Sequence, residues 1–275
     1  MLGSNPLGDP RVSNKRFKYS VFTKPWKMPG PELGRFVHDL GFDGIELPVR
    51  PGFQVEPERV EQDLPAVAGQ LADCGVQIFS VAGPADEPTI AACGALNIPF
   101  IRVMVDIPRD KGYLEAVAET QREYDRLVPL LDEHGVALGV QNHCGRYVPH
   151  AMGLWHCIAK YDPKHVAAVW DAAHEAIGGA EPEFAIDVVW SHLRMVNLKN
   201  AYWRRRSGPE AEDVEWSSYW TNGRQGLASW PRIAKELKRR DWRGIVCLTA
   251  EYSDHDAADR LIAHDVAYAK SLFED

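Results

Sequence analysis

The segment FKYSVFTKPWKMPGPELGRFVHDLGFDGIEL (17–47) holds one complete unit of strand, helix and strand. Residues 17–23 are rich in aromatic and β-branched side chains, which predicts a strand. Residues 31–41 carry apolar side chains at helical spacing and stop at a glycine, which predicts a helix and its end. A short apolar strand, 43–47, follows at once. A helix between two apolar strands is the building unit of a parallel sheet covered by helices.

This unit repeats to the C-terminus. We predict further strands at 76–83, 99–106, 136–142, 165–171, 192–200 and 244–252, and further helices at 57–75, 89–97, 113–134, 151–160, 182–190, 230–240 and 256–273. Eight strands alternating with eight helices predict an α/β fold, a single-domain (β/α)8 TIM barrel over residues 17–275, and the length fits the roughly 250 residues of such barrels. An open, doubly wound sheet is the alternative. It usually has fewer strands and carries a glycine-rich phosphate turn, and neither GxGxxG nor GxxxxGK[ST] occurs here.

The composition narrows the class of protein. A net charge of −8 and a pI of about 5.7 argue against a protein that binds the phosphate backbone of a nucleic acid. The five cysteines form no CxxC pair, which favours reduced thiols in a cytoplasmic protein. Residues 1–16, which we predict to be a flexible N-terminal segment, lack the apolar core of a signal peptide, and no apolar run is long enough to predict a membrane span.

Residues 201–229 form the one long connection without clear periodicity. Connections of this length in compact domains are usually functional or disordered. Aromatic residues with polar groups, among them Tyr202, Trp203, Trp216 and Trp220, favour an ordered active-site flap. The basic cluster 204–206 within it is predicted to be solvated.

Polar residues gather where the predicted strands end. In a barrel of this kind the C-terminal strand ends form the mouth that carries the chemistry. The residues at these ends are Lys24, Trp26, Glu46, Arg50, Arg102, Gln141, Asn142, His143, Asp171, His174, Asn197, Lys199 and Glu251. Structural explanations compete for some of them: His143 and His174 as hydrogen-bonding or capping histidines, and Lys199 as a lysine that extends to solvent. Carboxylates inside apolar strands would nevertheless need partners, which a charged mouth supplies.

Four stretches resemble the xylose isomerase-like superfamily of sugar-phosphate isomerases and epimerases. They are FTKPW (22–26) with GFDGIELPVRPG (41–52), QNHCGRYV (141–148) with Trp155, WDAAH (170–174) with the glycines 178–179, and VNLKN (196–200) with AEY (250–252). The resemblance extends from Phe17 to about Phe273. The QNH-G version at the fifth strand is similar to a variant branch of the superfamily.

The resemblance implies a divalent ion, Mn²⁺ or Mg²⁺, held at positions that correspond here to Gln141, Asp171, Asn197 and Glu251. Two of the four differ from the family pattern. At position 141 an amide stands in place of a carboxylate, and at position 197 an amide stands in place of an imidazole, so metal binding is left open. Gln141 cannot accept a proton. We therefore expect Glu251 to act as the catalytic acid or base together with His143 or Lys199.

The leading hypothesis is a sugar isomerase or epimerase that removes a proton next to a carbonyl group. Its substrate-binding residues would be Lys24, Glu46, Arg50, Arg102 and His174, with Trp26, Trp155 and Trp203 stacking on the sugar. A dehydratase or lyase acting on an oxidised sugar or cyclitol begins with the same proton removal and is the alternative. A barrel that only binds a sugar or a partner subunit is a third hypothesis.

A DNA-repair endonuclease of the same superfamily is disfavoured, because the larger set of metal ligands and the basic groove of such enzymes are not visible in this sequence. Barrels of this group often pair, so a homo-oligomer is a further expectation.

Overall fold

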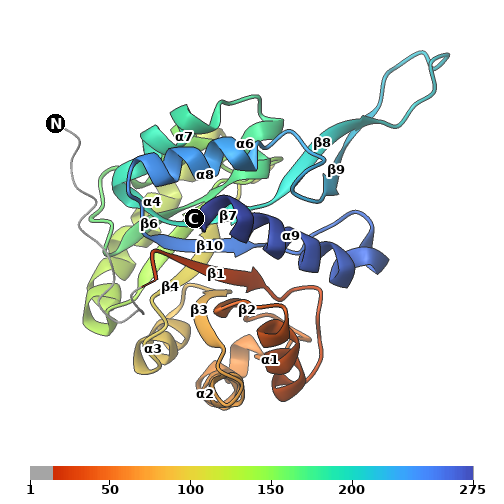
Figure 1. Cartoon of the computed structure of the whole chain (residues 1–275). Coiled ribbons are helices and arrows are strands. Elements are labelled where there is room, and N and C mark those ends of the chain that lie inside the picture. Colours follow the sequence, from red (N-terminus) through yellow and green to blue (C-terminus); the bar gives the residue numbers. More distant parts are fainter. Residues whose placement is uncertain (1–14, 275) are drawn as a thin grey trace.

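The computed structural model describes residues 15–274, so most of the segment 1–16 lies outside the described residues. Eight parallel strands close into a barrel (Figure 1). They are β1 (Phe17–Phe22), β2 (Gly44–Pro48), β3 (Gln77–Ala82), β4 (Phe100–Met104), β5 (Ala137–Gln141), β6 (Val166–Asp171), β7 (Leu193–Leu198) and β10 (Gly244–Leu248). Around the barrel their order is β1, β10, β7, β6, β5, β4, β3, β2. The predicted (β/α)8 TIM barrel is confirmed.

Helices surround the barrel (Figure 1). They are α1 (Gly30–Asp39), α2 (Val60–Ala72), α3 (Glu87–Ala95), α4 (Tyr113–His134), α5 (Ala151–Ile158), α6 (Ala172–Ile177), α7 (Pro182–Val189), α8 (Trp230–Arg239) and α9 (Ala258–Phe273). Short 3-10 turns are η1 (Pro57–Arg59), η2 (Trp190–His192) and η3 (His255–Ala257). Helix α4 ends at Gly135, whose φ of 63° is left-handed and therefore suits glycine.

The core has two parts because successive strand residues point to opposite faces. One face packs on the helices, with Leu33, Ile45 and Leu64 fully buried between the layers. The other face fills the barrel interior with Phe22, Phe79, Ala82, Phe100, Ala137, Val169, Met195, Ile245 and Cys247. Alternation therefore fixes which side chains can reach the mouth.

A two-stranded hairpin and a short helix were not predicted. Within the connection 201–229, the antiparallel strands β8 (Asn200–Arg205) and β9 (Trp216–Thr221) form a hairpin, which extends away from the barrel in Figure 1. The basic residues 204–206 lie on it and are exposed, as expected. Helix α6 begins directly after β6, within WDAAHEAIGG, and is too short to show a helical period in the sequence. The predicted helix 57–75 is also divided, since η1 precedes α2.

Candidate active site

On several strands, the side chains that face the barrel interior change from apolar to polar towards the C-terminal end of the strand. On β7, Met195 in the interior is followed two residues later by Asn197, which is 1% exposed. On β6, interior Val169 is followed by the fully buried Asp171. On β4, interior Phe100 is followed by the buried Arg102. The same period of two that builds the core thus brings polar side chains together above it.

A buried chain of hydrogen bonds crosses from β2 to β6. Arg102 donates from Nε to Oε2 of Glu46 at 2.8 Å and from Nη1 to Oε1 of Gln141 at 2.6 Å. Gln141 in turn donates from Nε2 to Oδ2 of Asp171 at 2.9 Å, and Ser80 donates to Oε1 of Glu46 at 3.0 Å. Burial alone would lower the pKa of Arg102, but the negative charges of Glu46 and Glu251 outweigh it and raise that pKa. Arg102 is therefore a fixed cation in the floor of the mouth.

Glu251 lies just beyond β10 between two lysines. Nζ of Lys24 donates to Oε1 at 2.7 Å, and Nζ of Lys199 donates to Oε2 at 2.7 Å. Burial would raise the pKa of Glu251, but the charges and hydrogen bonds of the two lysines dominate and hold that pKa well below its usual range. Glu251 is therefore an ionised carboxylate at neutral pH.

Asp171 ends β6 and caps α6. Its Oδ1 accepts the backbone N–H groups of Ala173 at 3.0 Å and His174 at 3.1 Å. Burial raises the pKa of Asp171 to about 6, although the charge of Lys199 and these hydrogen bonds oppose the rise. Both oxygens of Asp171 are thus engaged by the protein.

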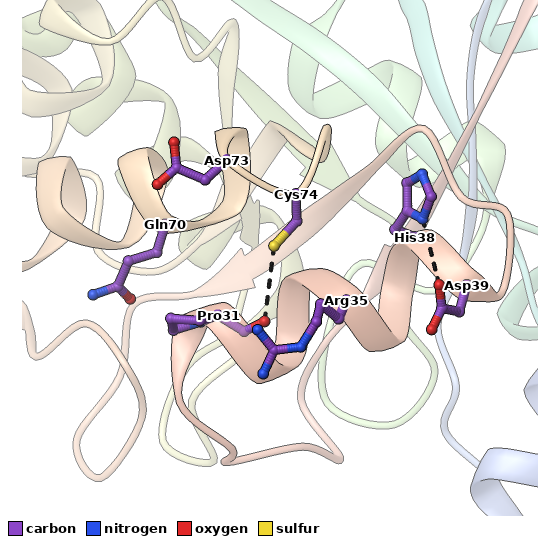
Figure 2. Close-up of a pocket in the computed structure, with 7 residues that line it drawn as sticks. All are labelled: Pro31, Arg35, His38, Asp39, Gln70, Asp73 and Cys74. Atoms are coloured by element: carbon purple, nitrogen blue, oxygen red, sulfur yellow. Dashed lines mark hydrogen bonds and ion pairs between the residues drawn. The ribbon is translucent and has the colours of Figure 1, made fainter.

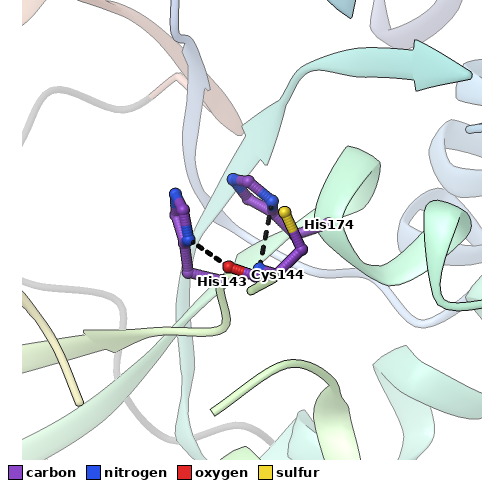
Figure 3. A group of neighbouring side chains, drawn as sticks. All are labelled: His143, Cys144 and His174. Carbon is purple, nitrogen blue, oxygen red and sulfur yellow. Dashed lines mark hydrogen bonds between the residues drawn. The ribbon is translucent and has the colours of Figure 1, made fainter. Parts of the chain in front are cut away.

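The backbone of Cys144 fixes the proton positions of two neighbouring imidazoles (Figure 3). Nδ1 of His143 lies 2.8 Å from the Cys144 carbonyl oxygen, which only accepts, so His143 carries its proton on Nδ1. Nδ1 of His174 accepts the Cys144 N–H at 3.3 Å, so the proton of His174 lies on Nε2. The ring centroids are 3.9 Å apart. Burial, together with the charge of Lys199, lowers the pKa of both rings, which makes them neutral bases at pH 7.

The hairpin reaches this group through Trp220 of β9. The ammonium of Lys199 lies 4.0 Å from the centroid of the Trp220 ring, and the His174 ring lies 5.0 Å from it. Trp203 of β8 donates from Nε1 to the Ile177 carbonyl at 2.9 Å and is 47% exposed. The base of the predicted flap therefore contacts the mouth residues, while Trp203 is attached to the end of α6.

The structure brings most of the predicted site residues together at the mouth. Two predicted tryptophans need correction, because they lie in the packing of the helical layer. Trp26 is 6% exposed, packs on Phe36 and donates to Oδ1 of Asp259 at 2.7 Å. Trp155 lies on α5 with its ring against His192, which precedes β7 at the opposite end of the barrel. Neither position suits stacking on a sugar at the mouth.

Glu175 is a buried carboxyl behind the site that the sequence analysis missed. Its Oε2 accepts hydrogen bonds from Asn142 at 3.2 Å, Trp170 at 3.0 Å and the Ala151 N–H at 2.9 Å. Burial raises the pKa of Glu175 to about 7. Its signal was an acidic residue next to the apolar residues Ala176 and Ile177 in WDAAHEAIGG, since a carboxyl group there would be costly to bury without partners.

The raised pKa of Glu175 predicts a pH-dependent loss of stability. The folded protein holds this proton more tightly than the unfolded chain, so the contribution is fully present below pH 4.5 and is lost as pH rises through 7. Moving the pKa from 4.5 to about 7 corresponds to about 3 kcal/mol. Glu175→Gln keeps the accepting oxygen, so urea unfolding should show it gaining stability relative to the wild type as pH rises from 5 to 8. Parallel pH profiles of the two proteins would contradict this.

The residues at the four positions expected to hold a divalent ion do not fit that role. The guanidinium of Arg102 contains only donor atoms, so the side-chain oxygen of Gln141 must face it. The amide N–H of Gln141 therefore faces Asp171. Both oxygens of Glu251 are bound by ammonium groups. Only the amide of Asn197 has no hydrogen-bond partner among the described residues. An ion here would also meet the charges of Arg102 and Lys199.

His143, Cys144 and His174 form a second group whose ligand atoms all lie within 4.8 Å of one another (Figure 3). A metal would need the thiolate of Cys144. Burial, however, is the larger effect on this thiol and raises its pKa, although the charge of Lys199 opposes the rise; the same charge would repel a bound cation. The group could hold a soft ion by spacing, but its surroundings favour the neutral side chains.

This geometry predicts the outcome of a metal titration. Elemental analysis and thermal shifts with Mn²⁺, Mg²⁺ and Co²⁺ should show neither retained metal nor stabilisation at micromolar ion concentrations, because cationic side chains already bind the oxygens of Glu251 and Gln141, and N–H groups bind those of Asp171. Gln141→Glu/Asn197→His/Lys199→Met restores the family ligands and removes one ammonium, so this variant should show a Mn²⁺-dependent shift. Stoichiometric Mn²⁺ in the wild type would overturn this view of the mouth.

A separate pocket of about 440 Å³ lies on the outer layer, between α1 and α2 (Figure 2). It is lined by Pro31, Arg35, His38, Asp39, Gln70, Asp73 and Cys74. The Cys74 thiol donates to the Pro31 carbonyl at 3.8 Å, and His38 contacts its neighbour Asp39 at 3.5 Å. No strand-end residue reaches this pocket, so the mouth remains the candidate active site.

Comparison with known families agrees with the barrel fold. The profile of the family described as "Xylose isomerase-like TIM barrel" matches residues 35–272. The chain belongs to this family. No curated protein sequence matches it significantly. Within residues 15–274 of this xylose isomerase-like barrel, no helix combines the length and apolar character needed to cross a bilayer.

Several solved structures share the fold at low sequence identity. A 3-keto-D-glucoside 4-epimerase from E. coli has a TM-score of 0.69 at 12% identity, over 93% of this xylose isomerase-like chain and 99% of its own. A probable 3-DHS dehydratase from Bacillus anthracis has a TM-score of 0.68 at 15% identity, over 91% and 97%. D-psicose 3-epimerase from Clostridium cellulolyticum H10 has a TM-score of 0.66 at 13% identity, over 94% and 100%.

Proposed function

We propose that this xylose isomerase-like barrel is an isomerase or epimerase of a sugar or sugar derivative that works by removing a proton next to a carbonyl group. The observation that carries the proposal is the presence of two different bases at one mouth. Glu251 follows β10 as an ionised carboxylate, and His143 follows β5 as a neutral imidazole. In the barrel order β7 and β6 separate these two strands, so the bases lie on nearly opposite sides.

Each base has a defined proton state. His143 is protonated on Nδ1, and none of the hydrogen bonds within residues 15–274 uses its Nε2, which therefore offers a lone pair. Glu251 accepts only from lysines and can take a proton when one of them moves to the substrate. A base on each side of a carbon can remove a proton from one face and return one to the other, which inverts that carbon.

Two donors are available for the negative charge that develops on the carbonyl oxygen. Lys199 contributes an ammonium, and His174 contributes Nε2–H, which is buried, has no hydrogen-bond partner among the described residues and lies 3.9 Å from Oδ2 of Asp171. Both lie against Trp220, so they share one side of the mouth. Preorganised donors of this kind are usually the largest contribution to such catalysis. The structural neighbours, which include two epimerases, support the same class of reaction.

The proposal is tested by incubating the purified protein in D₂O with a panel of ketoses, 3-oxo sugars and their acid and phosphate derivatives. Deuterium entering the carbon next to the carbonyl, followed by NMR, together with formation of an epimer or isomer, is the expected result. Loss of water from the product would instead assign the dehydratase or lyase alternative. Absence of exchange across the panel would favour a binding protein.

A further inference from the structure

Arg50 is a half-buried cation at the mouth without a protein acceptor. Its guanidinium lies 5.6 Å from the centroid of the Phe22 ring, and that of Arg102 lies 4.7 Å from the same ring. Arg102 is held by Glu46 and Gln141, whereas no carboxylate or carbonyl within residues 15–274 accepts from the Arg50 side chain. Burial, with the charge of Arg102, lowers the pKa of Arg50. An arginine placed in this way lacks the anion that its planar donors would bind.

The charges of the mouth do not cancel without a ligand. Glu46 is matched by Arg102, and the single carboxylate of Glu251 is matched by two lysines. Arg50 adds a further positive charge. Asp171 is the remaining acid, and its oxygens are engaged by Gln141 and by the start of α6. The cationic excess therefore lies on the side of β1 and β2, which carry Lys24 and Arg50.

Unpartnered polar atoms point to a ligand at the same end of the barrel. Both amide atoms of Asn197 and Nε2 of His174 are buried without a hydrogen-bond partner among the described residues, and each residue is 1% exposed. Buried donors and acceptors are almost always paired, by protein, water or ligand. Asn197 and His174 are suited to the oxygens of a polyhydroxy compound, while Arg50 is suited to a charged group.

We propose that the substrate carries an oxyanion, a carboxylate or a phosphate, that Arg50 binds through two parallel hydrogen bonds. This inference rests on the proposed sugar-processing function and adds the class of substrate to it. The uncharged part of the substrate lies between Glu251 and His143, and the anionic end lies towards β2. Lys24, at the end of the neighbouring strand β1, adds positive charge to this anion subsite.

Binding measurements that need no turnover test the anion subsite. Isothermal titration compares matched pairs of probes: D-glucuronate with its uncharged amide, and D-glucose 6-phosphate with D-glucose. The wild type should bind one anionic probe more tightly than its uncharged counterpart, and the preferred pair tells carboxylate from phosphate. Arg50→Met should weaken that anion about 10-fold to 100-fold and leave the uncharged probe unchanged. Arg50→Lys should recover part of the affinity, because it keeps the charge and loses the paired geometry.

Arg35→Met is the matched control, since Arg35 is exposed on α1 outside the mouth and should have no effect. Equal binding of charged and uncharged probes, no binding of either anion at millimolar concentration, or equal losses in the Arg50 and Arg35 variants would overturn the inference. Its failure is distinguishable from that of the proposed function. Arg50-dependent binding without deuterium exchange would refute the function alone, and exchange on uncharged sugars that is indifferent to Arg50 would refute the anion subsite alone.

Discussion

Replacing Glu251 by glutamine is expected to reduce deuterium exchange into one of the two epimers of the substrate about 10³-fold. The amide keeps an oxygen for Lys24 or Lys199 but cannot take up a proton. His143→Ala should have a comparable effect on the other epimer, because each base serves one face of the carbon. Either variant alone should abolish epimerisation while leaving exchange from the opposite face measurable by NMR.

The pattern across both variants is the decisive part of this experiment. Glu133→Gln, which makes the same chemical change at an exposed position near the end of α4, should exchange at the wild-type rate. Circular dichroism of each variant tells a lost base from a lost fold. Near-normal exchange in both Glu251→Gln and His143→Ala would refute the assignment of the two bases. Equal loss for both epimers in a single variant would instead indicate one base that serves both faces.

Arg102→Leu is expected to destabilise the protein by about 3–5 kcal/mol, since it removes the partner of a fully buried carboxylate. Glu46 would then keep only Ser80, which donates to Oε1. Urea unfolding measures the change at pH 7.

A second variant keeps this prediction specific to the ion pair. Arg102→Leu/Glu46→Gln removes both charges and retains an oxygen that can accept from Ser80, so it should recover most of the lost stability. A double variant as unstable as the single one would mean that the loss comes from packing around Phe22 and not from the buried charge. A loss below about 1 kcal/mol in the single variant would place Glu46 in a better solvated environment than its burial indicates.

The barrel could be predicted from the sequence because its two periodicities are simple. Apolar strands and amphipathic helices alternate along the chain, and glycines mark several helix ends. The same alternation located the inward polar residues, since Asp171 and Asn197 continue the register of the buried residues before them. Strand ends were therefore predictable as a set.

The pairing of those residues could not be predicted. Hydrogen-bond direction in Gln141 depends on Arg102, a residue of another strand that offers only donors. The contact between His143 and His174 depends on the start of α6, which is too short to show a helical period. The β8–β9 hairpin was missed because its strands, NAYWRR and WSSYWT, show no apolar alternation. Trp26 and Trp155 were misassigned because sequence position does not show whether an indole faces the mouth or the helices.

The peptide groups of Cys144 set the direction of proton transfer for both imidazoles, one through its carbonyl and the other through its N–H. The main chain consequently determines which imidazole nitrogen carries the proton in each ring, and the side chain at residue 144 takes no part in this. Replacing that side chain leaves the donor and the acceptor in place, whereas a shift of the loop backbone would exchange or erase both roles at once. For these two imidazoles, the conformation of the loop therefore matters more than the identity of its cysteine.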